Sequence, residues 1–442
     1  MTVIRQALTA LRRAITGVWD DIKASTDASL LGLARFVGLL YGPIDRSLSI
    51  DQALRKSLRY RLAPHVGWRH ALGSITYLLF IVLVITGVLL AIFYRPSVQE
   101  AYPSIQHIVS ETPFGWLARD LHHWSANLIV IVLLMHMARV FFEAAYKPPR
   151  ETNWLIGIVL LFVVLLFGGT GYLLPWDQWS YWTLTEVMTA ISSVPMVGRR
   201  MAEAVMGDVI PSGATLSRFF ALHVIVLPWI AFALLGYHFT LVRRRGIAPP
   251  MNVEGERRRW KRSGRFSPDG QPKEGTPFYP NHLLRSFIVA LVTVAIAITL
   301  AILYPRVLAD PADPYTVPET LVSTWVPVDV SLALIRLAGT WGFVLFSLLG
   351  VSLILIPLLD RGPARKLRER PVVAVLGLAF FIGYVGLWIA GRVIGAVAPS
   401  ESLGTGVVAE QPVPRPPSVP LPDGTRAEPS PAPESQREGG VR

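Results

Sequence analysis

The chain has 442 residues, of which 52% are hydrophobic and only 16% are charged, and its formal net charge at pH 7 is +12. A soluble domain of this size does not need so apolar a composition, so the sequence predicts a polytopic membrane protein. The sequence contains no cysteine, which excludes a thiolate metal site, an iron–sulfur cluster and any thioether-linked cofactor within the chain.

The first 69 residues are basic and mildly amphipathic. Apolar side chains recur in them at helical spacing, as at Ile4, Leu8, Leu11 and Ile15. Such a segment lies along a membrane interface as a helix, and a weakly ordered extension is the alternative that the sequence leaves open. A compact signal-peptide pattern is absent. Residues 1–69 are therefore predicted to be a basic N-terminal segment outside the membrane core.

Seven hydrophobic segments follow, each close to the ~20 residues that cross a hydrocarbon core of ~30 Å. They lie at about 70–93, 116–141, 154–174, 219–242, 285–304, 338–359 and 371–395. The sequence thus predicts an all-α membrane protein, with a four-helix transmembrane bundle over residues 70–245 and a three-helix transmembrane module over residues 281–395.

Positive charge is distributed unevenly among the loops. Arg243, Arg244 and Arg245 follow the fourth span, and further cations follow the second and the sixth. The loops on the opposite side carry few cations: Arg95, Arg199, Arg200 and Arg306. Loops rich in Lys and Arg stay cytoplasmic, so the N-terminus is predicted to be cytoplasmic and the C-terminal tail external. The charge reports topology and does not indicate a nucleic-acid partner.

Two stretches of different composition separate these parts. Residues 246–280 are polar and rich in Arg, Gly and Pro, which indicates a cytoplasmic linker between the two modules. After residue 396 the chain becomes dense in Pro, Ser, Glu and Arg with almost no aliphatic side chains. Residues 396–442 are therefore predicted to be a disordered tail.

Four histidines in two spans carry the strongest signal. His122 and His136 are fourteen residues apart, and His223 and His238 are fifteen apart. At ~100° per residue, these steps return to within about 40° and 60° of the starting face. Two such helices side by side can hold two haems stacked across the membrane, each with two axial imidazoles and no open position for oxygen. His123 fails this test, because thirteen steps to His136 end about 140° away.

The two pairs define two levels. On the topology above, the second and fourth spans both run from outside to inside, so His122 and His223 share an outer level and His136 and His238 an inner one. A hydrogen-bonded core histidine is the ordinary interpretation of any one of them. Ionisable residues inside membrane spans are costly and usually functional, however. Four at matched spacings favour two bis-histidine haems, ~21 Å apart.

Four glycines show the same spacing. Gly73 and Gly87 are fourteen residues apart in the first span, and Gly157 and Gly171 are fourteen apart in the third. Small residues let membrane helices approach closely, so plain helix packing is one interpretation. The period shared with the histidines favours another, in which each glycine makes room for a porphyrin ring and the four helices form a bundle around the cofactors.

Three arginines lie near the histidines in the sequence: Arg119, Arg139 and Arg218. A haem carries two propionates, and a guanidinium pairs well with a carboxylate. An arginine that extends its charge to the membrane interface is nearly as good an explanation for each one alone. We predict that these arginines assist haem binding.

Several segments resemble cytochrome b, and the resemblance covers about residues 60–395. Residues 169–182 are similar to the quinol-oxidation segment of that family. Three segments resemble the cytochrome b6 form of that family: His122–Ala126, Lys147–Glu151 and Arg218–His223. The fifteen-residue spacing of the second histidine pair is also that of the b6 form. Residues 280–315 are similar to the three-helix subunit IV that accompanies cytochrome b6, here fused in the same chain.

The resemblance implies the cytochrome b subunit of a bacterial quinol–cytochrome c reductase in the inner membrane. Quinol would be oxidised at the outer face, between the segment of Pro175, Trp176 and Asp177 and the loop after the fifth span. One electron would pass to a Rieske iron–sulfur protein and a c-type cytochrome. The other would pass through two b-type haems to a quinone at the inner face, coupled to proton translocation. The family also implies a homodimer surrounded by membrane lipid.

Two departures from the family matter. Cytochrome b6 holds an extra haem on a cysteine at the start of the first span, where this chain has Ala71, so no covalent haem is expected. The family's Pro-Glu-Trp-Tyr motif, whose glutamate accepts a quinol proton, aligns with residues 323–326 and puts Thr324 at the glutamate. A threonine hydroxyl can hydrogen-bond quinol but is not a general base near neutral pH. The candidate substitutes are Asp177, Asp329, Glu319 or a chain of water molecules.

Two other functions compete with this one. A dihaem membrane quinol dehydrogenase that feeds a non-Rieske partner is favoured by the missing glutamate and opposed by the intact segment from Pro175 to Gln178. A transporter or structural membrane protein without haem is the alternative from another class. Transporters often carry inverted repeats and broken spans, and the sequence shows neither.

Overall fold

The computed structural model describes residues 61–62, 66–248, 276–318, 321, 323 and 325–395. Seven helical segments within these residues are long and apolar enough to cross a membrane. They are Trp68–Phe93, Gly115–Phe142, Glu151–Leu173, Gly213–Arg245, Phe278–Leu303, Trp341–Leu359 and Pro371–Val393. The predicted all-α fold with seven spans is confirmed.

Several predicted features lie outside the described residues. They include most of the N-terminal segment and of the linker, the whole tail from residue 396, and the side chains of Glu319 and Thr324. The five-part division of the chain therefore stays a prediction.

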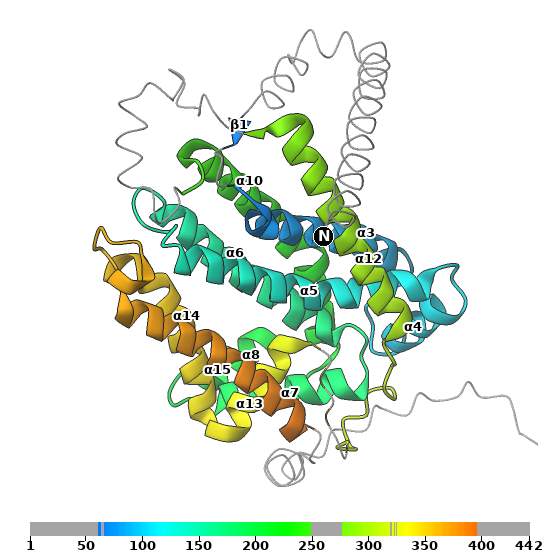
Figure 1. Cartoon of the computed structure of the whole chain (residues 1–442). Helices are drawn as coiled ribbons and strands as arrows, with labels where there is room; N and C mark the ends of the chain where they lie inside the picture. Colours follow the sequence, from blue (N-terminus) through cyan, green and yellow to red (C-terminus); the bar gives the residue numbers. More distant parts are fainter. Residues whose placement is uncertain are drawn as a thin grey trace, which may run out of the picture. The chain divides into compact units, whose positions relative to one another are not determined.

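The first four spans form a bundle. Helix α3 (Leu72–Phe93) packs against α5 (Gly115–Phe142), and α6 (Glu151–Leu173) packs against α10 (Leu227–Arg245), as Figure 1 shows. Large apolar side chains such as Ile85 and Val88 of α3 are exposed on the isolated chain. A helix that is apolar on all sides is stable inside a large core or in lipid. The outward faces of these helices are suited to contact with acyl chains.

The fourth span changes its winding part-way. It consists of α9 (Gly213–Ala221), a single π turn, η2 (Leu222–Val226), and α10. Pro228 stands at the start of α10, and a proline lacks an N–H and clashes with the carbonyl four residues before it. The wider π turn ends just before this proline and contains His223. Such turns inside helices are frequent at functional sites.

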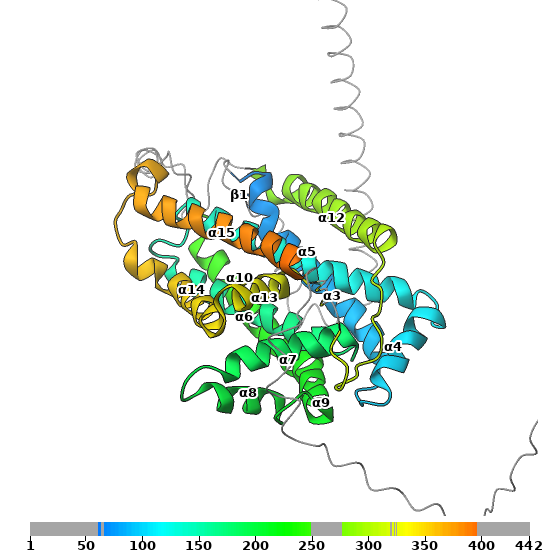
Figure 2. The same ribbon diagram turned by 90° about the horizontal axis from the view of Figure 1, so that it is seen from below.

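The second module lies along the bundle rather than apart from it. Helix α12 (Leu283–Leu303), which follows the turn η3 (Phe278–His282), packs on α5. Helix α13 (Val326–Ala338) packs on α14 (Thr340–Leu359) and α15 (Pro371–Gly395), and these contact α6 and α5 respectively (Figure 2). Both ends of the second module, α12 and α15, thus bear on α5, which carries His122 and His136.

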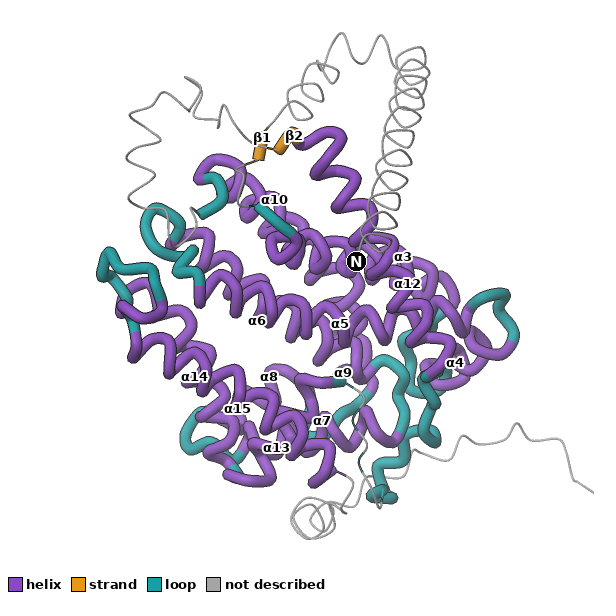
Figure 3. The backbone as a smooth tube through the Cα atoms, viewed as in Figure 1, coloured by secondary structure: helices purple, strands orange, loops and turns teal. Residues whose placement is uncertain are grey.

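Short elements outside the spans were not predicted from the sequence. They are the helices α4 (Ala101–Ser110), α7 (Gln178–Ser192), α8 (Gly198–Met206) and α13 (Figure 3), and the turn η4 (Leu367–Glu369). Two-residue strands β1 (Arg61–Leu62) and β2 (Thr276–Pro277) pair antiparallel. Because each strand precedes a span, the pair ties the approach to α3 to the approach to α12.

A buried ionic cluster joins the two modules. Asp360, at the end of α14, accepts hydrogen bonds from Lys147 Nζ at 2.8 Å and from Arg370 Nη1 at 2.8 Å, and it also pairs with the Tyr146 hydroxyl. Lys147 donates further to the carbonyl oxygens of Gly362 and Ala364. Although burial opposes ionisation, the hydrogen bonds from Lys147, Tyr146 and Arg370 hold the pKa of Asp360 below its ordinary value.

Replacing Asp360 with Ala should lower the stability of the detergent-solubilised protein by about 3–5 kcal/mol, because two buried cations lose their counter-ion. Thermal unfolding measures this loss. The stabilisation by Asp360 should be present above the ordinary carboxylate pKa of about 3.9 and disappear as the pH falls through the lower folded-state value. Glu369→Ala is the control: Glu369 pairs with Lys366 at 3.8 Å on the surface, so its loss should cost less than about 1 kcal/mol. Equal losses would contradict the prediction.

Candidate functional site

His122 and His223 face each other across the bundle. His122 lies on α5 and His223 in the π turn of the fourth span, and their ring centroids are 6.2 Å apart. Nδ1 of His122 lies 2.9 Å from Oγ1 of Thr86, and Nδ1 of His223 lies 3.0 Å from the carbonyl oxygen of Phe167. A histidine that binds a metal through one ring nitrogen hydrogen-bonds through the other. The remaining nitrogen of each ring, Nε2, is the one suited to an axial bond.

The spacing of these two rings fits one iron atom between them. An imidazole–metal bond is about 2.0–2.1 Å long, as measured for zinc. Two imidazoles on opposite sides of one metal therefore have centroids roughly 6 Å apart. The observed 6.2 Å between the rings of His122 and His223 agrees with that value. The residues present fit an axial pair for a haem.

Glycines clear the space beside these rings. A Cβ added at Gly171 would lie 2.5 Å from Cε1 of His223, and one added at Gly87 would lie 3.3 Å from Cε1 of His122. The first distance is too short for any side chain unless the ring moves. We call this part of the bundle the His122 end.

The same arrangement recurs at the other end of the bundle, which we call the His136 end. A Cβ added at Gly73 would lie 3.2 Å from Cε1 of His136, and one at Gly157 would lie 3.8 Å from Cε1 of His238. Nδ1 of His238 is buried and makes no hydrogen bond of normal geometry within the described residues, although the ring lies near the backbone of Asn153. Each predicted glycine thus faces one predicted histidine, at the level that its position in the sequence indicated.

The three predicted arginines differ in their contacts. Arg119 donates to the carbonyl oxygen of Arg306 at 2.6 Å, and Arg218 donates to a backbone carbonyl of α8 at 3.3 Å. Arg139 pairs with Glu143 at 3.6 Å, and its Nε is buried without a partner among the described residues. Of the three, Arg139 keeps a buried donor that a propionate could use. Their role in haem binding stays a prediction.

His123 is placed away from both pairs. Its Nε2 lies 3.4 Å from Nδ2 of Asn127, one turn along α5, and its ring contacts Trp124 at a centroid distance of 5.7 Å. The facing contact with His223 belongs to His122. This arrangement agrees with the register argument.

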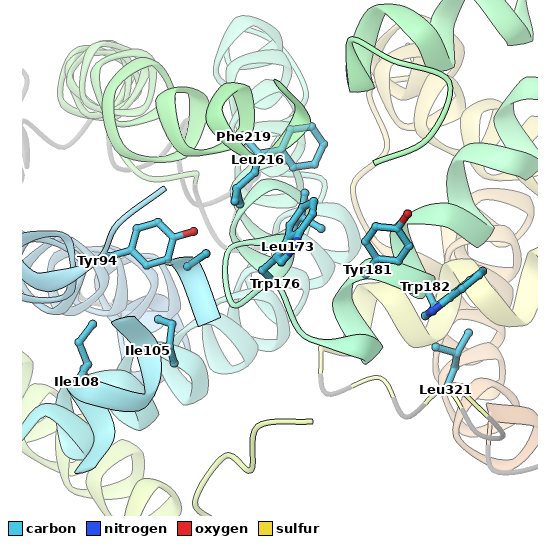
Figure 4. Close-up of a cluster of buried hydrophobic side chains, with 11 residues drawn as sticks. Tyr94, Ile105, Ile108, Leu173, Trp176, Tyr181, Trp182, Leu216, Phe219 and Leu321 are labelled. Carbon is cyan, nitrogen blue, oxygen red and sulfur yellow. The ribbon is translucent and has the colours of Figure 1, made fainter. Parts of the chain in front are cut away.

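The segment after the third span makes a strained turn. Trp176 has a φ of +53°, a left-handed conformation that a bulky residue adopts only when its surroundings enforce it. Its buried ring packs at 5.7 Å from that of Tyr181, within an apolar cluster shown in Figure 4. The cluster includes Leu173, Leu216 and other side chains from four helices. The surroundings that hold this turn come from α4, α6, α7 and α9, together with Leu321 of the second module.

Asp177 is fully buried and engaged on both sides of its carboxylate. Oδ1 accepts a hydrogen bond from the backbone N–H of Ser180 at 2.9 Å and caps α7. Oδ2 lies 3.4 Å from the N–H of Ala309 and 4.0 Å from Arg306, and Asp177 forms a β-bridge with Pro311. These contacts bring the loop after the fifth span against the Pro175–Asp177 turn, as predicted. They favour a positioning role for Asp177 over the predicted role in proton transfer.

Comparison with known proteins decides the family. The family description "Cytochrome b/b6/petB" matches residues 58–246, and "Cytochrome b(C-terminal)/b6/petD" matches residues 311–402. Cytochrome b6 of Prochlorothrix hollandica is 40% identical over 188 residues, which are 42% of this chain and 85% of that protein. Cytochrome b6 of Synechococcus sp. (strain JA-3-3Ab) is 37% identical over 212 residues, 48% of this chain and 99% of that protein. The chain belongs to the cytochrome b/b6 family.

A solved structure extends this match to both modules. A chain of "Hyperthermophilic respiratory Complex III" superposes with a TM-score of 0.69 and 29% identity, over 79% of this chain and 91% of that chain. This cytochrome b is therefore a multi-pass membrane protein with a b6-like module followed by a subunit IV-like module. Membership of the family implies b haems, and it argues against the haem-free transporter considered above.

In this cytochrome b, a tryptophan docks the second module onto the bundle. The indole of Trp325 occupies the space beside Gly168 of α6, where an added Cβ would lie 1.8 Å from the ring. Its Nε1 lies 3.3 Å from the carbonyl oxygen of Ala126, and the N–H of Val326 donates to Oδ1 of Asn127 at 3.1 Å. Gly168 and Asn127 were not predicted from the sequence. The glycine-rich run of residues 168–171 was the available signal.

Two hydroxyls lie unpartnered beside this docking point. Those of Tyr172 and Thr183 are buried and make no hydrogen bond of normal geometry within the described residues, although they lie near each other and near Ser323. Buried polar groups are nearly always paired, so an orphaned pair indicates a place for water or a polar ligand. These residues were also missed from the sequence.

Proposed function

We propose that this cytochrome b is the dihaem subunit of a bacterial quinol–cytochrome c reductase of the complex III type. It oxidises quinol at the His122 end and passes electrons across the membrane through two non-covalent b haems to a quinone site at the His136 end. Proton release and uptake at the two faces couple this transfer to proton translocation. The likeness to a chain of a respiratory Complex III supports this assignment.

The observation that carries the proposal is the pairing of histidines and glycines at two levels of one bundle. His122 faces His223 at 6.2 Å, and all four predicted glycines lie beside the four predicted ligands. A haem held by two imidazoles supplies one-electron transfer and has no open position for oxygen. The hydrogen bonds to Nδ1 orient the rings of His122 and His223. The glycines, which have no Cβ, leave room for the haem beside these rings.

The quinol pocket is assigned to the turn of Pro175, Trp176 and Asp177, together with Thr324 from the facing loop. Trp176 and its apolar cluster exclude water, and Asp177 holds the two segments together. The orphaned hydroxyls beside Ser323 are suited to hydrogen-bond the hydroxyl groups of a quinol.

The charge distribution supports an inner-membrane topology. Lys147, Arg365 and Arg370 gather beyond the His136 end, and the last turn of α10 carries three further arginines, so this end is proposed to face the cytoplasm. The N-terminus then lies inside and the C-terminal tail outside. The proposed partners are a Rieske iron–sulfur protein, a c-type cytochrome, membrane lipid and a second copy of this chain.

One observation favours an alternative function. Thr324 stands where the family has glutamate, which favours a dihaem quinol dehydrogenase that feeds a partner other than a Rieske protein. The two functions share the haems and differ in the electron acceptor.

Purification of the intact complex from its native membranes tests the proposal. A reduced-minus-oxidised spectrum should show b haems, and an iron–sulfur subunit and a c-type cytochrome should co-purify and accept electrons from added quinol. Quinol oxidation without an iron–sulfur subunit would support the alternative. Absence of both b haem and quinol oxidation would contradict both functions.

A further inference from the structure

A second acid lies close to the proposed quinol pocket. Asp329 is in the first turn of α13 and is 4% exposed. Helix α15 packs against its backbone, since a Cβ added at Gly391 would lie 2.1 Å from the carbonyl oxygen of Asp329. Its carboxylate Oδ2 lies 3.8 Å from Nε of Arg392, whose side chain is half-exposed. Asp329 thus stands between the buried interior and the surface.

The other acids of this region are fully occupied. Asp177 caps α7 and holds the facing loop. Glu186 makes a two-pronged ion pair with Arg336, at 2.9 and 3.0 Å. Asp329 has a single, long ion-pair contact by comparison. Its other partners, Ser323 and Trp388, are neutral. Of these three acids, Asp329 is therefore the one with capacity to take up a proton.

Ser323 connects the pocket to this acid. Its hydroxyl lies near both the Tyr172 hydroxyl and the Asp329 carboxylate. It donates to the carbonyl oxygen of Trp325 at 3.2 Å, compared with about 2.7–2.8 Å for a good O–H···O bond, and it accepts from the N–H of Trp325 at 3.3 Å, compared with about 2.9–3.0 Å for a good N–H···O bond. The hydroxyl is weakly held and can rotate. Arg392 donates to the Ser323 carbonyl at 2.5 Å, which fixes the backbone that carries it.

We propose that Asp329 accepts a proton from quinol through the hydroxyl of Ser323, in place of the glutamate that this chain lacks at Thr324. The inference rests on the proposed function. As quinol becomes quinone, two O–H bonds break and two electrons leave, one to the iron–sulfur partner and one to the bound b haem. One proton passes to Ser323 while the serine proton passes to Asp329, which later releases it to water beside Arg392. The second proton passes directly to water.

The electrostatics of the site agree with this role. Burial raises the pKa of Asp329 to about 6, although Arg392 opposes the rise, and a base that titrates near the working pH is the most effective. Arg392 and Tyr384 of α15 are the charged and titratable groups that face it. The other helices near Asp329 add no charged group beside it. Helix α14 carries no ionisable side chain, and α5 presents the neutral Asn127. Arg336, paired with Glu186 of α7, lies two turns further along α13.

Quinol oxidation by the purified complex between about pH 5 and pH 8 tests the proposal, with decylubiquinol and a menaquinol analogue as substrates and equal haem content. The rate of the parent should fall as the pH drops through about 6, because a protonated Asp329 cannot accept a proton. Asp329→Asn should be slower by about 10²-fold or more at neutral pH and should lack this decline. Asp329→Glu should restore part of the rate.

Two further variants separate proton transfer from a structural role. Arg392→Gln removes the cation but keeps the acid. The fall in rate at low pH, which is the acid limb of the pH–rate profile, should therefore move to higher pH. A structural tie between α13 and α15 predicts no such movement. Glu203→Gln is the matched control, since Glu203 pairs with Arg199 on the surface of α8, and its profile should equal that of the parent.

The outcomes distinguish the two proposals. If the parent complex oxidises neither quinol, the proposed function fails and this inference fails with it. If the parent is active and Asp329→Asn keeps both its rate and its acid limb, only the inference is wrong. An acid limb that disappears in Glu319→Gln and persists in Asp329→Asn would assign the proton to Glu319. If Asp329→Asn does not assemble, an acid limb that stays in place in Arg392→Gln overturns the proposal.

Discussion

Replacing His122 or His223 with Leu should halve the haem content of the purified protein by removing the haem at the His122 end. Replacing His136 or His238 should remove the other haem and spare the first. The reason is geometric: each iron needs two imidazoles, and each pair of ligands belongs to one level of the bundle. Haem quantification and the two b-type signals of a reduced-minus-oxidised redox titration measure the result.

His123→Leu is the matched control, because His123 is adjacent to a ligand in the chain but directed toward Asn127. It should keep both haems and both signals. Loss of one haem in this variant, with both retained in His122→Leu, would assign the ligand to His123 and overturn the register argument. Loss of both haems in every variant would indicate that the bundle cannot assemble with one haem.

The sequence predicted the features that depend on helix periodicity. The seven spans follow from the length of their apolar runs, and the levels of the histidines and glycines follow from steps of fourteen and fifteen residues. Both depend on distances along a single helix. The shared level of Gly171 and His223 could be predicted because the two helical segments that carry them both cross the membrane.

Features that depend on contacts between distant segments were not predicted. The docking of Trp325 beside Gly168 joins residues more than 150 positions apart, and no local pattern encodes it. The π turn at His223 had a local cause in Pro228 that periodicity alone does not reveal. Asp177 was one of four candidates for the proton acceptor, because its neighbours resemble a quinol segment. Its burial and its cap on α7, which favour a positioning role, became visible only with the fold.

Gly171→Ala should weaken haem binding at the His122 end, and Gly157→Ala should leave the His136 end unchanged. The two glycines are fourteen residues apart on α6, so the gain in helix propensity of up to about 1 kcal/mol is the same for both and cancels in the comparison. The added methyl group meets His223 at 2.5 Å in one case and His238 at 3.8 Å in the other. Overpacking of the first kind costs about 1–3 kcal/mol, or roughly 5- to 150-fold in haem affinity.

The measurement is the haem content and the midpoint potential of each haem in the two single variants and the parent. Gly87→Ala and Gly73→Ala, with contacts of 3.3 and 3.2 Å, should fall between the two extremes, because the histidine ring must give way by only a few tenths of an ångström. A ranking with Gly171 most sensitive and Gly157 least would show that clearance beside the ligand rings is the purpose of these glycines. Equal effects at all four positions would instead favour plain helix packing, since close approach of the helices is needed equally along their length.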